Sequence, residues 1–353
     1  MGAHGQEQHT SEAIQAVVLK NLAAIGFHGE YQALEVNIGQ LKRQNSTSSR
    51  IGGVISVQGT DPSGRGNRVN LWAKKVEEPA RAFDAIHTLY GLLEKNGIHQ
   101  PVPKPLFYDP AMGLLFMERI PGRCLLSAIA AGCVWSSDRH FDRYRERLVA
   151  IGRWMANWHS VASVGKSTTL ASMLPAVEGA LSSGSHFSVE EQSQLREHLR
   201  SLAGSALAHA EWPLVTPHND ITLRNLFIDQ DRFHVIDWDA MVHPRFARQA
   251  IVWWDLITLL MNIESLMRFR PLTSREKLRD LCSSLWQGYM DARPGAQIGL
   301  DEFRKSIMFV VVLRYYCGLG SDRPLYRIYR HNLGWRYSRA VRRRLLAGSG
   351  SLF

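Results

Sequence analysis

The hydrophobic pattern of the chain is mainly that of strands before residue 120 and mainly that of helices after it, and this change restricts the possible folds more than any other feature. Segments 31–41, 50–59 and 68–76 have the pattern of strands and are separated by polar stretches typical of turns. Beyond residue 120, apolar residues recur with the period of an α-helix. A run of strands followed by a run of helices predicts an α+β protein with two lobes.

The first lobe is predicted to contain a small five-stranded antiparallel sheet with one crossing helix. The helix is expected over 77–97, because Pro79 stands near its start. The last two strands are expected within 107–122, around a Pro-Ala-Met-Gly turn. Ahead of the sheet, 11–22 has helical periodicity, and 1–10 is predicted to be a polar tail.

The second lobe is predicted to be larger and mainly helical, with one β-hairpin at 225–239. Helices are expected over 138–163, 188–209, 246–266, 273–291 and 300–317. The predicted organisation is an N-terminal lobe over 1–116, a hinge over 117–122 and a helical C-terminal lobe over 123–353. A ligand-binding cleft is expected between two such lobes.

The composition is that of a globular protein. The 353 residues, 45% of them hydrophobic, are enough for two lobes with a substantial core. Cys124, Cys133, Cys282 and Cys317 lack Cys-x-x-Cys spacing, which indicates buried thiols rather than disulfides or a zinc site. The polar start of the sequence has no secretory signal pattern, so a cytoplasmic location is expected.

The net charge of +10 is concentrated in the last third of the chain. Residues 1–240 contain 23 Lys or Arg and 24 Asp or Glu, whereas residues 241–353 contain 19 and 8. Such a basic region favours an anionic partner, such as an acidic substrate or an anionic membrane, but a solvated helix face explains it equally well. Nucleic acid is not expected as a partner, because no recognised binding module accompanies the charge.

A group of polar residues occurs in an apolar setting at 216–239, in TPHNDITLRNLFIDQDRFHVIDWD. Asp220 and Asn225 have the Asp-x-x-x-x-Asn spacing of the kinase catalytic loop, and Asp237 follows twelve residues after Asn225. An aspartate near a substrate hydroxyl can accept its proton or orient it for attack on a γ-phosphate. An amide oxygen and a second carboxylate are hard ligands that suit magnesium. The pattern therefore predicts a magnesium-dependent phosphoryl-transfer site.

A second candidate phosphate site, the Gly-Lys-Ser-Thr sequence at 165–168, has little support. A P-loop has a glycine five residues before Gly165, where this chain has Ser160, and it follows a strand, whereas a helix is predicted here. We expect a helix-terminating loop instead. No Gly-x-Gly-x-x-Gly pattern follows a predicted strand, so a dinucleotide-binding fold has no support.

The motif PHNDITLRNLFID…VIDWDA resembles the signature of the aminoglycoside phosphotransferase and choline kinase superfamily, whose members have the two-lobed fold of protein kinases. Three further segments resemble that family in order and approximate spacing: GLLFMERIPGRCL its hinge, LVAIGRWMANWHSV a helix that ends near a His, and VWWDL a later Asp-containing helix. The resemblance covers about residues 30–320. Without the family resemblance, the apolar surroundings of His159 in the sequence indicate a core residue.

The resemblance implies a role for each matching polar residue. Asp220 corresponds to the catalytic base, and Asn225 and Asp237 correspond to the magnesium ligands. Three supporting residues are also implied: His218, Asp239 and Asp255. Many aminoglycoside-type members have Gly at the position of Asn219. The Asn of this chain is closer to choline kinase-like members.

The resemblance also implies a nucleotide site in the first lobe. Its lysine is expected to be Lys74, with Lys75 as the alternative, because only one of two successive strand residues faces a cleft. The remaining residues implied for the nucleotide are Ser48, Ser49, Met117, Glu118 and Arg119. Ala82 stands where the family usually has the glutamate that pairs with the lysine, and Asp84 and Glu78 are the nearby carboxylates that could substitute for it.

The sequence thus predicts a small-molecule kinase that transfers the γ-phosphate of ATP, with GTP as the alternative, to a hydroxyl group with the help of magnesium. The basic C-terminal lobe favours a neutral or anionic acceptor, such as a sugar, an amino alcohol or a glycoconjugate, over a polycationic antibiotic. Two other functions stay open. One is an inactive nucleotide-binding protein, and the other is a protein that contacts polyanions or anionic membranes through its basic C-terminus.

Overall fold

The computed structural model describes residues 3–31, 33–39, 42–43, 51–98, 102–129, 138–184, 187–230, 232–241, 248–266, 274–293, 298–318 and 340–349. The chain divides into two compact units. The first comprises Met1–Gly122 and Phe227–Val242, and the second comprises Arg123–Leu226 and His243–Phe353. The contacts of Phe227–Val242 therefore group it with the N-terminal residues. The lobe boundaries predicted from the sequence included it in the C-terminal lobe, 123–353.

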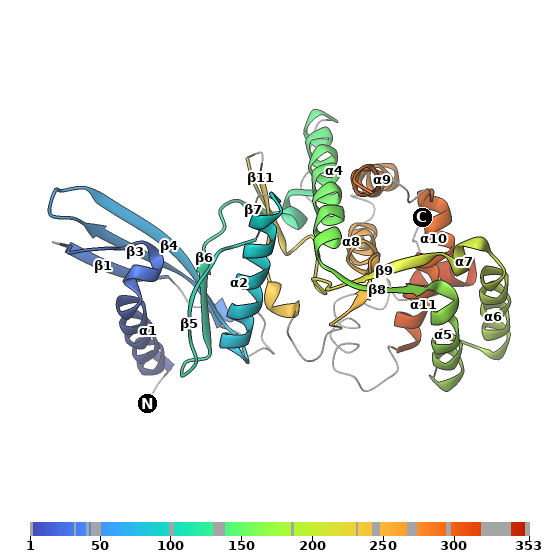
Figure 1. The fold of residues 1–353 in the computed structure, drawn as a ribbon, viewed down its shortest axis with the longest axis horizontal. Coiled ribbons are helices and arrows are strands. Elements are labelled where there is room, and N and C mark those ends of the chain that lie inside the picture. Colours follow the sequence, from blue (N-terminus) through green and yellow to red (C-terminus); the bar gives the residue numbers. More distant parts are fainter. Residues whose placement is uncertain are drawn as a thin grey trace. The chain divides into compact units, whose positions relative to one another are not determined.

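The first unit is built on an antiparallel sheet with the strand order β1-β3-β4-β6-β5 (Figure 1). The strands are β1 (Ala33–Ile38), β3 (Ile51–Thr60), β4 (Gly66–Lys75), β6 (Leu114–Glu118) and β5 (Pro105–Asp109). The two-residue strand β2 (Lys42–Arg43) adds to β3. The predicted five-stranded sheet and the α+β class are confirmed.

The helices of the first unit pack against this sheet. They are α1 (Ala3–Lys20), the short η1 (Leu22–Ile25) and α2 (Pro79–Lys95). Ile14 and Val18 of α1 join Leu71 and Phe116 of the sheet in one core cluster. The expectation of a polar tail over 1–10 was wrong, since α1 begins at Ala3. That stretch has no apolar face to show a helical period, but its Ala, Gln and Glu residues favour helices.

The chain returns to the first unit through β10 (Leu226–Asp229), β11 (Arg232–Val235) and the 3-10 helix η2 (Trp238–Met241). β10 and β11 form the predicted hairpin. Trp238 is buried, and its indole N–H donates to the carbonyl oxygen of Val235 at 2.7 Å. This contact fixes the chain around Asp237.

The second unit is mainly helical, as predicted. It contains a short strand β7 (Arg123–Cys124) and the helices α4 (Asp138–Val161), α5 (Leu170–Gly184), α6 (Val189–Ala203), α7 (Ala206–His209), α8 (Trp254–Glu264), α9 (Arg275–Asp291), α10 (Leu300–Lys305) and α11 (Ile307–Gly318). The predicted helix 188–209 is divided into α6 and α7, and 300–317 into α10 and α11. The helix expected from residue 246 begins only at Trp254.

A three-stranded sheet in the second unit was not predicted. Its order is β12-β9-β8, from β12 (Ala250–Ile251), β9 (Glu211–Val215) and β8 (Ser163–Thr169). The Gly-Lys-Ser-Thr segment lies in β8, so the expected helix-terminating loop was wrong. Ser and Thr give β8 no apolar alternation to recognise, and its pairing with β9, some forty residues later in the chain, is a tertiary contact.

Helices α4 and α9 approach each other closely through two glycines. A Cβ atom at Gly288 would overlap the carbonyl oxygen of Val149, and one at Gly152 would overlap that of Leu285. The backbones can therefore pack only because these positions lack side chains. Since α4 and α9 carry residues of the site described below, this packing fixes part of its frame.

We expect Gly288→Ala to lower the free energy of unfolding by about 3 kcal/mol, because the added methyl group meets backbone atoms that cannot rotate away. Gly179→Ala in α5 is the matched control, since a Cβ there meets open space. Removing a helical glycine should stabilise the control by up to about 1 kcal/mol. Urea unfolding of both variants measures the difference, and equal stabilities would contradict the close packing.

Candidate active site

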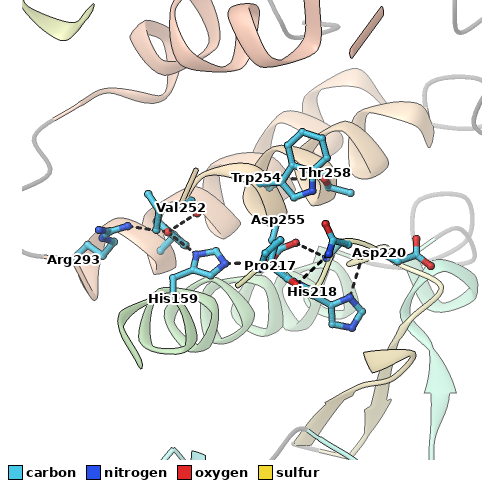
Figure 2. Close-up of polar contacts among 11 residues, drawn as sticks. His159, Pro217, His218, Asp220, Val252, Trp254, Asp255, Thr258 and Arg293 are labelled. Carbon is cyan, nitrogen blue, oxygen red and sulfur yellow. Dashed lines mark hydrogen bonds and ion pairs between the residues drawn. The ribbon is translucent and has the colours of Figure 1, made fainter. Parts of the chain in front are cut away.

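The segment that contains Asp220 is held in place by Asp255, in the first turn of α8 (Figure 2). The backbone N–H of His218 donates to Oδ2 of Asp255 at 2.8 Å, and the N–H of Asn219 donates to Oδ1 at 3.1 Å. Both oxygens of one buried carboxylate thus bind consecutive amides of the loop. This arrangement fits the supporting role that the sequence implied for Asp255.

Asn219 occupies the left-handed region of backbone space, with φ of 69°. Only glycine enters this region without cost, and asparagine tolerates it better than most other residues. The conformation thus gives a physical reason for the alternation of Gly and Asn that the family resemblance suggested at this position. The turn at Asn219 directs the chain into Asp220.

Asp220 is half-buried and is tied to Asn225. The side-chain amide nitrogen of Asn225 donates to Oδ2 of Asp220 at 3.0 Å and to its carbonyl oxygen at 2.8 Å. The amide nitrogen is therefore used within the loop, which leaves the amide oxygen of Asn225 as its group for a cation. A second tie comes from α8, where Oδ1 of Asn262 accepts the N–H of Leu223 at 2.9 Å.

His218 is completely buried within the loop. Its Nδ1 lies 3.3 Å from the backbone nitrogen of Asp220, so the ring nitrogen accepts that N–H. This contact stabilises the turn that precedes Asp220. The structure thus gives His218 a place in the loop's internal hydrogen bonding.

Behind the loop, Asp255 also meets His159, at the end of α4. Nε2 of His159 lies 3.3 Å from Oδ2 of Asp255, and both side chains are buried. Burial by itself would raise the pKa of Asp255, but the hydrogen bond from His159 and the N–H of His218 outweigh it, so that the pKa lies below its ordinary value. Asp255 is therefore a buried carboxylate held in its ionised form.

In the first unit, Lys74 is buried on β4, whereas the neighbouring Lys75 is exposed. Nζ of Lys74 lies 2.8 Å from Oδ1 of Asp237. A buried ammonium group is costly unless it is paired, and this carboxylate provides compensation. The structure therefore joins the predicted nucleotide lysine to one of the predicted magnesium ligands.

Helix α2 presents mainly apolar side chains to the interior of the first unit. Its buried side chains are apolar, and Ala82 is one of them. Glu78 pairs instead with Arg81 at 3.0 Å, and Asp84 is exposed. Asp237, from beyond the β10–β11 hairpin, supplies a carboxylate to Lys74.

The other predicted site residues are Met117, Glu118, Arg119, Ser48, Ser49 and Asp239. Met117 is buried in β6, while Glu118 and Arg119 are exposed, and their backbone N–H groups donate to the carbonyl oxygens of Lys104 and Asn70. Ser48 and Ser49 lie outside the described residues. Asp239 lies in η2, and its side chain is outside the described part of the structure.

Sequence reasoning missed several polar residues that support the loop, namely Asn262, Tyr289 and Arg293. Asn262 and Tyr289 lie in helices α8 and α9, where a polar atom gives no periodic signal, and Arg293 follows the end of α9. Among the described residues, no group of three or more His, Cys, Asp or Glu side chains is arranged to hold a metal. A magnesium ion held by one amide, one carboxylate and the phosphates of a nucleotide needs no such group.

The model of the phosphotransferase enzyme family matches residues 68–285, which is more than half of the chain and includes Lys74, Asp220, Asn225, Asp237 and Asp255. The sheet unit and the helical unit together make an α+β protein. The chain belongs to the phosphotransferase enzyme family. The predicted membership of the aminoglycoside phosphotransferase and choline kinase superfamily is thereby confirmed.

Solved structures similar to the chain include three kinases. A choline/ethanolamine kinase family protein from Mesorhizobium loti is 19% identical, with 95% of this chain and 98% of that chain covered and a TM-score of 0.46. A choline kinase from Streptococcus pneumoniae is 14% identical, with 96% and 98% covered and a TM-score of 0.45. A glucosamine kinase in complex with glucosamine, ADP and phosphate is 15% identical, with 84% and 79% covered and a TM-score of 0.45. No curated protein sequence matches the chain.

Proposed function

We propose that the protein transfers the γ-phosphate of ATP to a hydroxyl group of a small molecule or glycoconjugate. The observation that carries this proposal is the anchoring of the loop around Asp220, in which a buried, ionised Asp255 holds two consecutive amides and Asn225 holds the Asp220 carboxylate. Such an arrangement keeps a potential base in one orientation. Orientation and charge neutralisation supply most of the rate in phosphoryl transfer.

Each residue has a part in the proposed reaction. Asp220 accepts the proton of the acceptor hydroxyl, or orients the hydroxyl, as its oxygen attacks the γ-phosphorus. Asn225 and Asp237 would hold magnesium through hard oxygen atoms, and their donor types fit this ion. Bound magnesium would neutralise charge on the phosphates. Lys74 would add a positive charge to the same phosphates.

The proposed acceptor is neutral or anionic, because the last third of the chain is strongly basic. Part of this basic charge is already used within the second unit. Arg342 pairs with Glu191 at 2.6 Å and lies over the ring of Phe187. Arg342 thus helps to attach the C-terminal segment to α6, which favours a structural role for it over a role in binding polyanions.

Membrane contact is the second candidate function for the basic C-terminus. In the described part of the chain, no helix is long and apolar enough to cross a bilayer. Removing residues 336–353 tests for surface contact. Unchanged binding to anionic vesicles would exclude this segment as the contact. The cytoplasm, where ATP is abundant, is the proposed location of the reaction.

A nucleotide-consumption screen tests the proposed function. Purified protein is incubated with magnesium and ATP or GTP, and with sugars, amino alcohols, phosphorylated metabolites and kanamycin-like compounds in separate reactions. We expect consumption that depends on both a hydroxyl-bearing acceptor and Asp220. Consumption with the cationic antibiotics alone would overturn the preference for a neutral or anionic acceptor.

Lys74→Met is expected to raise the nucleotide KM by about tenfold or more, since it removes a positive charge from the proposed phosphate site. It also leaves the Asp237 carboxylate without this ammonium partner. The matched control is Lys75→Met, which changes the adjacent, exposed lysine. A KM that rises in the Lys75 variant and not in the Lys74 variant would contradict the assignment.

A further inference from the structure

A chain of hydrogen-bonded polar side chains continues from Asp255 within the second unit, on the side away from the loop (Figure 2). Nδ1 of His159 lies 2.8 Å from the hydroxyl oxygen of Tyr289, in α9. Nη1 of Arg293 lies 3.2 Å from the same hydroxyl oxygen. Figure 2 shows Arg293, His159, Asp255, His218 and Asp220 following one another across the view. The proposed reaction gives no role to Arg293, Tyr289 or His159.

The burial of this chain makes its polar atoms costly. His159 is 1% exposed and Tyr289 is 0% exposed, and the ring of Tyr289 lies 5.5 Å from that of Trp253. A phenylalanine would fill the space of Tyr289 without the cost of burying a hydroxyl group. The polar atoms are therefore not needed for packing. Their contacts lead to the carboxylate that holds the loop.

The hydrogen bonds of Tyr289 determine where the ring proton of His159 lies. Burial raises the pKa of Tyr289, so its hydroxyl keeps its single proton. Arg293 can only donate to the hydroxyl oxygen. The proton can then go to Nδ1 of His159 at 2.8 Å or to the carbonyl oxygen of Val252 at 3.3 Å. The shorter distance favours Nδ1 as the acceptor.

We propose that Tyr289 and His159 are positioning residues for the catalytic loop. The hydroxyl of Tyr289 donates to Nδ1 of His159, which places the ring proton on Nε2, and Nε2–H donates to Asp255. Asp255 then receives three N–H groups, from His159, His218 and Asn219. The inference rests on the proposed function only in treating this loop as catalytic.

The opposite tautomer would disturb the loop. With its proton on Nδ1, His159 would present the lone pair of Nε2 to the Asp255 carboxylate, and two acceptors would face each other. Asp255 could avoid this repulsion only by moving or by taking up a proton. Either change weakens its bonds to His218 and Asn219, which set the turn ahead of Asp220. Tyr289 thus acts on Asp220 through three intervening groups.

The tautomer can be observed directly. In protein labelled with ¹⁵N-histidine, long-range nitrogen–proton correlations distinguish the Nε2–H form, the Nδ1–H form and the doubly protonated ring. The signals of His159 are identified by their loss in His159→Gln. We expect the Nε2–H form in the wild-type protein. The Nδ1–H form or a doubly protonated ring would overturn the proposal.

The effect on the loop is measured by hydrogen exchange in Tyr289→Phe, which preserves the packing volume. We expect exchange in a peptide spanning 216–223 to accelerate about tenfold, while peptides from α4 and α9 keep their wild-type rates. Tyr144→Phe, in α4 but outside this chain of hydrogen bonds, should leave all these rates unchanged. A uniform acceleration in Tyr289→Phe, or none at 216–223, would show that the hydroxyl has no specific effect on the loop.

Activity gives a third readout that separates this inference from the proposed function. Tyr289→Phe should lower kcat about tenfold and leave the nucleotide KM unchanged. His159→Gln, whose amide N–H can replace Nε2–H, should retain more activity than His159→Leu. If the wild-type protein transfers no phosphate, the proposed function fails, but the tautomer and the exchange rates still decide the role of Tyr289. If transfer occurs and Tyr289→Phe matches the wild type in both hydrogen exchange and activity, only this inference fails.

Discussion

Replacing Asp220 with asparagine should lower kcat by about a thousandfold and leave the fold and nucleotide affinity intact. Asparagine has the shape of aspartate, and its oxygen can still accept the hydrogen bond from Asn225. It cannot take up the proton of an acceptor hydroxyl. The loss should therefore appear in kcat, because the changed group acts in the transition state and not in nucleotide binding.

The control for Asp220→Asn is Asp229→Asn, a half-buried aspartate at the end of β10 that has no proposed role in the reaction. Steady-state kinetics with varied ATP and acceptor separate kcat from KM, and calorimetric titration measures nucleotide binding. If Asp220→Asn keeps its full rate, Asp220 is not the base. If it keeps its biological activity while no phosphate transfer is found in the wild type, the inactive nucleotide-binding alternative is favoured.

Replacing Asp255 with asparagine should lower the free energy of unfolding by about 3 kcal/mol or more. One carboxylate oxygen becomes an NH₂ group, which then faces an N–H donor from the loop or from His159. A buried donor without an acceptor is the costly outcome. Asp291→Asn is the control. This residue at the end of α9 is exposed, and its ion pair with Arg153 is long, at 3.9 Å, and open to solvent.

The same substitution should change the pH dependence of stability. The pKa of Asp255 is lowered in the folded protein, so its contribution is fully present above the ordinary value of 3.8. It is lost as the pH falls through the lower, folded pKa, because the unfolded chain binds the proton first. Urea unfolding between neutral and acidic pH should therefore show a smaller acid loss in Asp255→Asn than in the wild type. Parallel curves would contradict the ionised, buried state of Asp255.

The parts of the structure that were predictable from the sequence depend on local patterns. The strands of the first sheet have β-branched residues between turns, and Asp220 and Asn225 have a fixed spacing within one loop. The β12-β9-β8 sheet was not predictable in this way, because β8 is polar and its partner lies far along the chain. The length of α1 was missed for a similar reason, since the sequence of its first residues has no apolar periodicity.

Contacts between distant residues account for most of what the sequence could not predict about the site. Lys74 and Asp237 are separated by 163 positions, so the local search for a carboxylate on α2 could not find this partner. His159 and Tyr289 are separated by 130 positions and lie in helices whose apolar period indicates only a core. A polar atom on such a face becomes informative only when its hydrogen-bond partner is known.

Transfer of labelled phosphate tests the central claim most directly. Wild-type protein and Asp220→Asn are incubated with γ-labelled ATP, magnesium and the acceptor that best supports nucleotide consumption, and the product is identified by mass spectrometry. We predict a phosphorylated hydroxyl that carries the label, formed by the wild type about a thousandfold faster than by Asp220→Asn. Label that appears only as free phosphate with every acceptor, or at equal rates in both proteins, would contradict the assignment of Asp220 as the base of a phosphotransferase.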